Sequence, residues 1–121
     1  MATLDQQRAT FAWAAISEVK PNLVKKEYTN LAKAIPTMMM SNGLMQTLAF
    51  LQAKNEEQHQ KLLAHILNWL DIRFSMGGLS FEKAINALHY SDSATYMQLT
   101  NETMALLRWI RQFADARKAM G

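Results

Sequence analysis

The chain has 121 residues, half of them hydrophobic, so it is long and apolar enough to bury a core without covalent cross-links. It contains no cysteine, which excludes disulfides, thiolate catalysis and thiolate-bound metals. The net charge of +3 gathers in two segments, because residues 20 to 33 hold four lysines against one glutamate and residues 101 to 121 hold four basic against two acidic side chains.

The first two predicted elements are helices. Thr3 and Gln6 have the spacing of a capping box, which predicts a helix from there to about residue 19, with apolar residues at helical spacing. Pro21 ends this helix and favours the start of a second one, over residues 22 to 34.

The next segment, "IPTMMMSNGLMQTLAFLQAK", allows two interpretations. Asn42 and Gly43 between apolar runs are typical of a β-hairpin turn. The flanking residues, however, are mainly Met, Leu, Ala and Gln, which favour helices over strands. We therefore expect one continuous helix from Pro36 to about Lys54. Its apolar residues point in nearly all directions, which is typical of a buried helix.

One narrow strip of this helix differs from the rest. Asn42, Gln46, Ala49 and Ala53 recur at helical spacing and form a seam of small and polar side chains. Gly43 lies beside the seam, where its missing side chain permits close approach by another backbone. Geometry favours tight packing of the seam within the helical bundle. The alternative is contact with a partner protein or a nucleic acid strand.

A membrane span is not expected in this region. Residues 34 to 53 carry no charge, but they include a proline and six polar side chains, too many for an apolar span of about 20 residues. The first ten residues, "MATLDQQRAT", lack the basic and apolar regions of a signal peptide. We therefore expect a cytoplasmic protein without membrane contact.

Three further helices complete the predicted fold. Asn55 and Gln58 have the spacing of another capping box, and the sequence "MGG" is typical of the end of the helix that they begin. Ser80 is expected to cap a short helix, and Ser91 or Asp92 a long final one. No segment alternates as a strand would. The predicted fold is all-α, a compact bundle of five or six helices forming a single domain over residues 1–121.

The residues that could carry catalysis are few. The histidines, His59, His65 and His89, lack the spacing of a zinc-binding helix, and no glycine-rich phosphate loop is present. His65 is interpreted as a helix-face residue rather than a base. Glu102 is a candidate acid, but a lone carboxylate in a helix is more often a surface ion-pair partner. We expect no enzymatic activity, no metal and no cofactor.

The final helix is predicted to be amphipathic. Arg108 and Arg111 stand one turn apart on its polar face, where phosphates are candidate partners and Asp115 is an alternative partner for Arg111. Trp109 lies at the boundary, a position that suits amphipathic packing but also contact with a partner or a stacked base. The apolar stripe consists of Tyr96, Leu99, Thr103, Leu106, Leu107, Ile110, Phe113 and Ala114.

Two blocks, "IPTMMMSNGLMQTLAFL" and "YMQLTNETMALLRWIRQFADA", together resemble the small-subunit family of type III-B CRISPR effector complexes, the Cmr complexes. The first resembles the family's proline, apolar triplet and Asn-Gly-Leu pattern, although methionines replace the more usual branched side chains in the triplet. The second resembles its Leu-Thr-x-Glu and Trp-apolar-Arg-x-Phe-Ala patterns. The matching residues are Pro36, Asn42, Gly43, Leu44, Leu48, Ala49, Phe50, Leu99, Thr100, Glu102, Trp109, Ile110, Arg111, Phe113 and Ala114.

The resemblance implies a non-catalytic subunit of an RNA-guided antiviral complex. Copies of such a subunit stack along the inner filament with other Cmr subunits and help to hold guide RNA and target RNA. A solvated helix face is the alternative explanation for the basic segments. The residues expected to contact RNA phosphates are Lys20, Lys25, Lys26, Lys54, Arg108, Arg111, Arg117 and Lys118. The residues expected at a partner or close-packing seam are Asn42, Gly43, Gln46 and Trp109.

The main alternative function is that of a helical adaptor that binds another protein and no nucleic acid. It is favoured by the methionine-rich helix, since flexible methionine surfaces suit partner helices. Salt separates the two hypotheses, because phosphate binding weakens steeply as salt rises.

Overall fold

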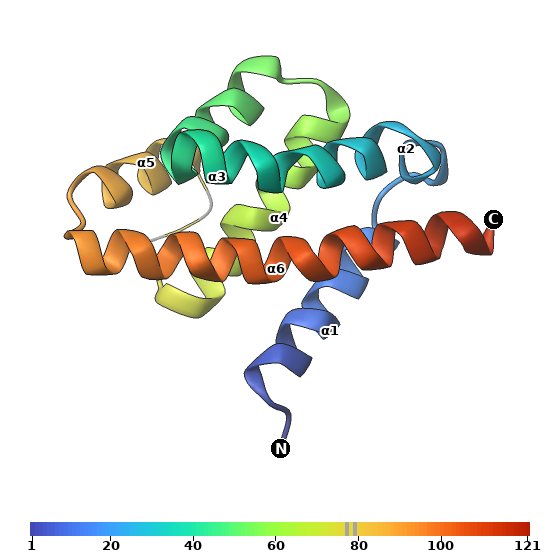
Figure 1. Cartoon of the computed structure of the whole chain (residues 1–121), viewed down its shortest axis with the longest axis horizontal. Coiled ribbons are helices and arrows are strands. Elements are labelled where there is room, and N and C mark those ends of the chain that lie inside the picture. The colour runs from blue at the N-terminus through green and yellow to red at the C-terminus, as the bar shows by residue number, and fades with distance from the viewer. Residues whose placement is uncertain (77, 79) are drawn as a thin grey trace.

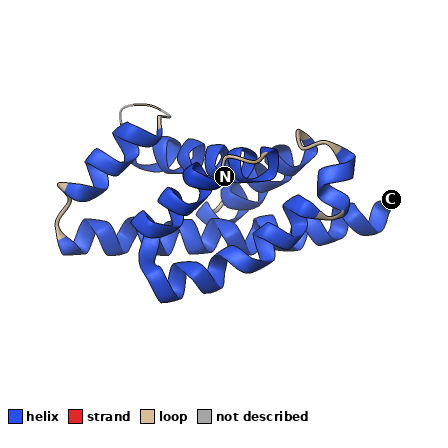
Figure 2. Ribbon diagram, turned by 90° about the horizontal axis from the view of Figure 1, so that it is seen from above, coloured by secondary structure: helices blue, strands red, loops and turns tan. Residues whose placement is uncertain are grey.

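Six α-helices and no strand are present in residues 1–76, 78 and 80–121, which the computed structural model describes (Figure 1). The ribbon in Figure 2 shows these helices joined by short loops. The predicted all-α fold is confirmed. The elements are α1 (Leu4–Ser17), α2 (Pro21–Lys25), α3 (Glu27–Lys54), α4 (Glu57–Phe74), α5 (Phe81–His89) and α6 (Ser93–Met120).

The long helix α6 organises the packing. It runs along the longest axis of the molecule, with α5 near its first turns and α2 near its C-terminal end (Figure 1). It contacts α1, α2, α3 and α4, and α3 also packs on α4. Buried side chains from all six helices join in one hydrophobic core. None of the helices described is long and apolar enough to span a membrane.

Three helix starts match the sequence prediction. Thr3 and Gln6 exchange backbone-to-side-chain hydrogen bonds of 2.8 and 3.1 Å, which completes the capping box of α1. Ser80 and Asp92 each accept a hydrogen bond from the backbone N–H three residues further on, at 3.1 and 2.7 Å. Asp92 therefore caps α6, whereas the hydroxyl of Ser91 donates to a carbonyl of the preceding helix.

The predicted helix boundary at Pro36 is wrong. The chain turns earlier, at Lys26, whose φ of −145° separates α2 from α3. Pro36 then lies inside α3, next to the fully buried Ile35. Packing of this face on the core outweighs the backbone hydrogen bond that proline cannot donate.

Two predicted caps are also wrong. Asn55 does not begin α4 with Gln58. Its φ of 53° and ψ of 21° make it the left-handed cap that ends α3, a conformation that asparagine tolerates better than most residues. The N-cap of α4 is Glu56. Ser75 takes the left-handed position at the end of α4, so the predicted ending at Met-Gly-Gly lies too late; Gly77 is outside the described residues.

Gly43 interrupts α3. Its φ of 85° and ψ of 173° are not helical, so the predicted uninterrupted helix is wrong at this residue. Two hydrogen bonds satisfy backbone groups around the break: Thr47 Oγ1 donates to the carbonyl of Gly43 at 2.8 Å, and the N–H of Met45 donates to the hydroxyl of Tyr96 at 3.0 Å. The Asn-Gly pair therefore marks a break within a helix rather than a hairpin.

The methionine triplet shows that α3 is buried on part of its surface only. Met39 is 3% exposed and Met38 is partly buried, but Met40 is 80% exposed. The prediction of burial all round is wrong for this face, because none of the described helices covers Met40.

Gly43→Ala should lower the free energy of unfolding by about 1 to 3 kcal/mol, because this backbone conformation is open almost only to glycine. Space is not the reason, since an added Cβ would lie 3.6 Å from the Tyr96 hydroxyl, an ordinary contact. The measurement is chemical denaturation of parent and variant. Ser41→Ala, on the exposed surface of the same helix, is the control and should change stability by less than about 0.5 kcal/mol. Equal or greater stability of Gly43→Ala would contradict the strained backbone.

Candidate nucleic-acid interface

The polar face of α6 carries two exposed arginines. Arg108 and Arg111 line a shallow hollow together with Gln112 and Asp115. Asp115 forms its ion pair with Lys33 of α3, at 2.9 Å, and not with Arg111. Among the described residues neither arginine has an ion-pair partner, so both guanidinium groups are available to an external anion.

A second basic group forms where α2 meets the end of α6. Lys25, Arg117 and Lys118 line one cleft, together with Pro21 and Val24. The two helices lie side by side at this end of the molecule (Figure 1). The fold thus joins one cation from the first basic segment with two from the second. Arg117 and Lys118 also suit the last turn of a helix, where cations interact favourably with the helix dipole.

The other predicted RNA contacts are more dispersed. Lys20 pairs with Glu57 at 3.0 Å, and both side chains are largely exposed. Lys26 follows directly after α2, next to Lys25, and is exposed. Lys54 is in the last turn of α3, an element that contributes to neither of the two basic groups.

Trp109 lies half-buried between α6 and α1. Its indole N–H donates to Asp5 Oδ1 at 3.0 Å, and its ring centroid is 5.4 Å from that of Phe113. The hydrogen bond from Trp109 is the main reason that the pKa of Asp5 is lowered, with further contributions from Arg8 and Arg108. The predicted boundary position of Trp109 is confirmed, and its orientation is fixed by α1.

The seam on α3 does not pack inside the bundle. Asn42, Gln46, Ala49 and Ala53 are not buried, so the favoured prediction of internal packing is wrong. Gly43 is half-buried, and its backbone conformation rather than a close neighbour requires glycine. The seam lies at the surface because the opposite side of this half of α3 faces the core. That inward side consists of Leu44, Thr47, Leu48 and Leu51.

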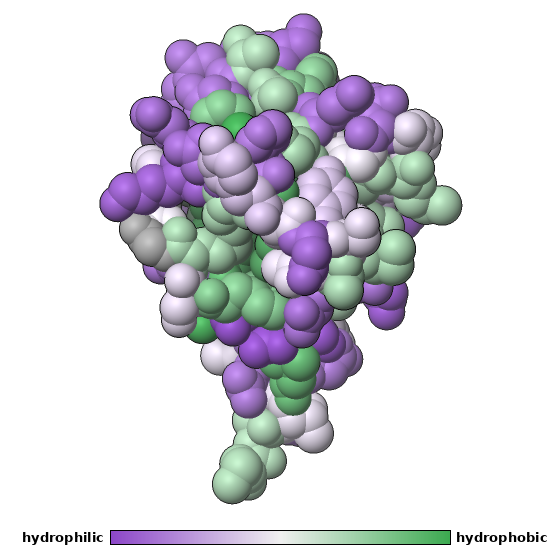
Figure 3. Space-filling model, turned by 90° about the vertical axis from the view of Figure 1, so that its left-hand side faces the viewer, coloured by the Kyte–Doolittle hydropathy of each residue, from purple (hydrophilic) through white to green (hydrophobic). Residues whose placement is uncertain are grey.

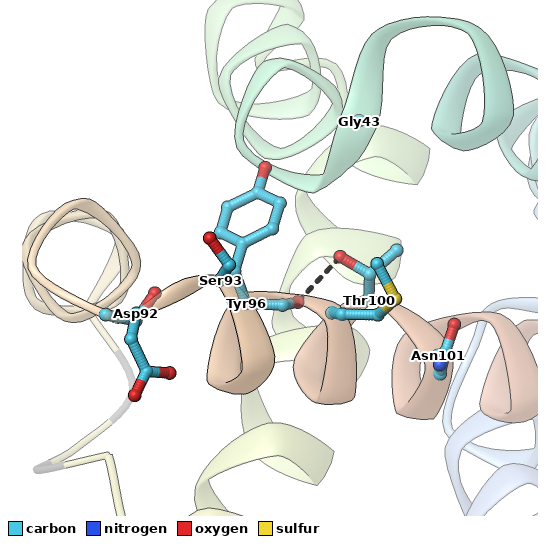
Figure 4. A pocket seen from close by; sticks show the side chains of 8 residues that line it. Gly43, Asp92, Ser93, Tyr96, Thr100 and Asn101 are labelled. Atoms are coloured by element: carbon cyan, nitrogen blue, oxygen red, sulfur yellow. Dashed lines mark hydrogen bonds between the residues drawn. The ribbon is translucent and has the colours of Figure 1, made fainter.

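Two hollows flank the first turns of α6, at the end of the molecule that Figure 3 shows with hydrophobic side chains among polar ones. The hollow in Figure 4 measures about 490 Å³ and has one ionisable side chain besides tyrosine, Asp92, whose carboxylate caps α6. This arrangement offers shape and apolar surface rather than acid–base chemistry. Its lining is Gly43, Ser91, Asp92, Ser93, Tyr96, Met97, Thr100 and Asn101.

Glu102 is the centre of a buried ion-pair cluster, so its prediction as a surface ion-pair partner is wrong. Its side chain is 5% exposed and accepts hydrogen bonds from Arg8 at 2.6 and 3.0 Å, from the Trp69 indole at 2.9 Å and from Arg73 at 3.4 Å. The hydrogen bonds from Arg8 contribute most to lowering the pKa of Glu102 to about 2. A carboxylate held ionised in this way is a structural anion, not a general acid.

His65, predicted to lie on a helix face, lies on the buried face of α4. Its Nδ1 lies 2.7 Å from the hydroxyl of Tyr28, and burial lowers the pKa of His65 to about 4. Burial also raises the pKa of Tyr28, so the hydroxyl stays protonated and shares a hydrogen bond with the neutral ring, whose tautomer sets the direction of the bond. No group of three or more His, Asp or Glu side chains suited to a metal ion exists in the part of the chain that the structure describes.

Sequence reasoning missed one surface residue, Trp13. Its side chain is 38% exposed, and its ring centroid lies 5.4 Å from that of Phe113 in an edge-on contact. A signal was present in the sequence, because Trp13 falls outside the buried stripe of α1, which includes Ala12, Ala15 and Ile16. A large aromatic residue off the core stripe indicates an exposed aromatic surface.

Comparison with known proteins gives concordant matches. The family model described as CRISPR-associated protein (Cas_Cmr5) matches residues 4–117. The protein described as CRISPR system Cmr subunit Cmr5 from Thermus thermophilus is 29% identical over 119 residues, which is 96% of each chain. A crystal structure of a CRISPR-associated Cmr5 family protein from Thermus thermophilus is similar, with a TM-score of 0.77 and 26% identity over 96% of this chain and 97% of that one.

Proposed function

The chain belongs to the Cmr5 family of CRISPR-associated proteins, and we propose that it is a non-catalytic small subunit of a type III-B Cmr effector complex that contacts the backbones of guide and target RNA. The match to residues 4–117 supports the assignment to this complex. A non-catalytic role agrees with the interior, where the ionisable Glu102 and His65 are engaged by Arg8 and Tyr28.

The basic surface of α6 carries the RNA-binding part of the proposal. Arg108 and Arg111 form no ion pair among the described residues, and Arg117 shares a cleft with Lys25. Contacts of this kind to phosphates add affinity that does not depend on sequence. Affinity that does not depend on RNA sequence suits a complex in which base pairing with a guide RNA recognises the target.

Contact with other Cmr subunits, including copies of this chain in a filament, has its best candidate surface on α3. The seam residues Asn42 and Gln46 lie at the surface, and Met40 of the same helix is 80% exposed. An exposed methionine on this helix is suited to protein contact, because methionine adapts its shape to a partner.

A helical adaptor without nucleic acid is the second candidate function. It is favoured by the apolar side chains exposed near the hollow at Gly43, where Met97 is 62% exposed. The adaptor hypothesis does not explain the two basic groups.

The proposal is tested by purifying the full chain from its host with the proteins bound to it, and by sequencing any nucleic acid recovered. We expect other Cmr subunits together with short RNAs that map to a CRISPR array. Recovery of protein partners free of nucleic acid, at low as well as high salt, would favour the adaptor and overturn the RNA-binding proposal.

A further inference from the structure

Three aromatic rings form a continuous strip where α1 packs on α6. Phe113 is the middle ring: its centroid is 5.4 Å from that of Trp13, with the planes at 77°, and 5.4 Å from that of Trp109, with the planes at 36°. We call Trp13, Phe113 and Trp109 the aromatic strip. Two helices that are far apart in the sequence thus present one surface.

Core packing does not account for the whole strip. Trp109 and Phe113 are half-buried against the core, but Trp13 is 38% exposed. Trp69, by contrast, is 3% exposed, and its indole N–H donates a hydrogen bond to Glu102. The indole N–H of Trp13 makes no hydrogen bond within the described residues, and part of the Trp13 side chain faces solvent.

A cation follows Phe113, the middle ring of the strip, one helical turn further along α6. Trp109, Phe113 and Arg117 follow each other at intervals of four residues, so they share one side of α6 and advance by about 6 Å per step. Arg117 then lines the cleft that also contains Lys25 and Lys118. The aromatic surface therefore leads directly into the second basic group.

The Trp109 end of the strip is anchored and also borders a cation. The hydrogen bond from Trp109 to Asp5 holds the ring in place, and Arg8 pairs with the same carboxylate at 3.2 Å. Arg108 is near enough to contribute to the lowered pKa of Asp5. The Asp5 carboxylate is thus bonded to Trp109 and Arg8. The exposed cation at this end of the strip is Arg108, on α6.

We propose that the aromatic strip stacks unpaired bases of single-stranded RNA, whose phosphates lie on the cations that flank Trp109 and Phe113 along α6. The inference rests on the proposed RNA-binding function and assigns the form of the nucleic acid. Charge complementarity selects this occupant, since Arg108 before these rings and Arg117 after them along α6 match a polyanion that carries planar bases. Stacking of this kind tolerates any sequence because every base has a π-face.

The test is binding of a fluorescently labelled, single-stranded uridine oligonucleotide to the full chain. Trp13→Ala should weaken binding by about tenfold while leaving the slope of log affinity against log salt unchanged, because a stacked base is lost and no phosphate contact is. Trp13→Phe should retain most of the affinity. Tyr90→Ala, which removes an 82% exposed aromatic side chain near the first turn of α6, is the matched control and should bind like the parent.

A second readout does not depend on the stability of the alanine variant. RNA should quench the tryptophan fluorescence of the parent through Trp13 and Trp109, since Trp69 is buried, and Trp13→Phe should lose the share of that quenching due to Trp13. If the parent binds RNA but Trp13→Ala binds equally well, the stacking inference is overturned and the proposed function stands. If the parent binds no RNA, alone or in the assembled complex, the proposed function itself fails. If Trp13→Ala binds RNA normally but no longer joins the Cmr subunits, the strip is a protein contact and the inference is wrong.

Discussion

Glu102→Ala should lower the free energy of unfolding by about 3 to 5 kcal/mol, because removing one member of a buried ion-pair cluster leaves its partners uncompensated. The carboxylate joins three helices: Arg8 reaches it from α1, Trp69 and Arg73 from α4. The Arg8 side chain is 18% exposed and can turn partly to water, which places the expected loss toward the lower end of the range. Urea denaturation of parent and variant is the measurement.

Two further variants serve as comparisons for Glu102→Ala. Glu102→Gln should lose less stability than Glu102→Ala, since the amide oxygen still accepts the Trp69 indole hydrogen bond. Glu18→Ala removes an exposed carboxylate at the end of α1 and should change the unfolding free energy by less than about 0.5 kcal/mol. If Glu102→Ala unfolds at the same urea concentration as the parent, the cluster does not join α1 to the core as described.

Between pH 7 and pH 4 the parent should lose stability on the order of 3 kcal/mol through His65. Burial lowers the pKa of His65 from 6.5 to about 4. In this window the unfolded chain binds a proton that the folded chain excludes, so the contribution is fully present above pH 6.5 and is lost as the pH falls toward 4. Burial also lowers the pKa of His59, which adds a loss in the same direction.

The pH dependence is tested by measuring unfolding free energies of parent and His65→Gln across this window. The variant should be less stable at pH 7 but should lose less on acidification, whereas His89→Gln, at an exposed site, should follow the parent. Glu102 affects stability at lower pH than His65 does. Its contribution to the free energy of unfolding is present above its ordinary pKa and is lost as the pH falls through about 2. Identical pH dependence of parent and His65→Gln between pH 6.5 and about 4 would contradict the assigned role of the Tyr28–His65 pair.

Local chemistry explains which parts of the fold could be predicted. The caps at Thr3, Ser80 and Asp92 use groups within three residues of one another, so the sequence contains the whole interaction. The breaks between residues 20 and 56 depend instead on tertiary packing. Pro36 stays helical because Ile35 and Met39 of the same helix are buried in the core, and Asn55 ends a helix instead of starting one.

The candidate interface could be predicted in part for the same reason. The exposed Arg108 and Arg111 follow from the period of a single helix. The pairing of Asp115 with Lys33 joins two different helices and could not be read from spacing along one of them. The burial of Glu102 could not be predicted either, because Arg8, its closest partner, lies 94 residues away.

Binding of RNA phosphates by the polar face of α6 underlies the proposed function, and a salt titration of RNA binding is its sharpest test. The proteins compared are the parent and the Arg108→Ala, Arg111→Ala double variant, each within the assembled complex. Both side chains lie outside the core, so the fold should be nearly unchanged. If each arginine neutralises one phosphate, the slope of log affinity against log salt should become shallower by roughly 1.4 to 1.8 units, and affinity should fall uniformly across RNA sequences. Equal slopes and equal affinities for the two proteins would show that this face does not bind RNA phosphates.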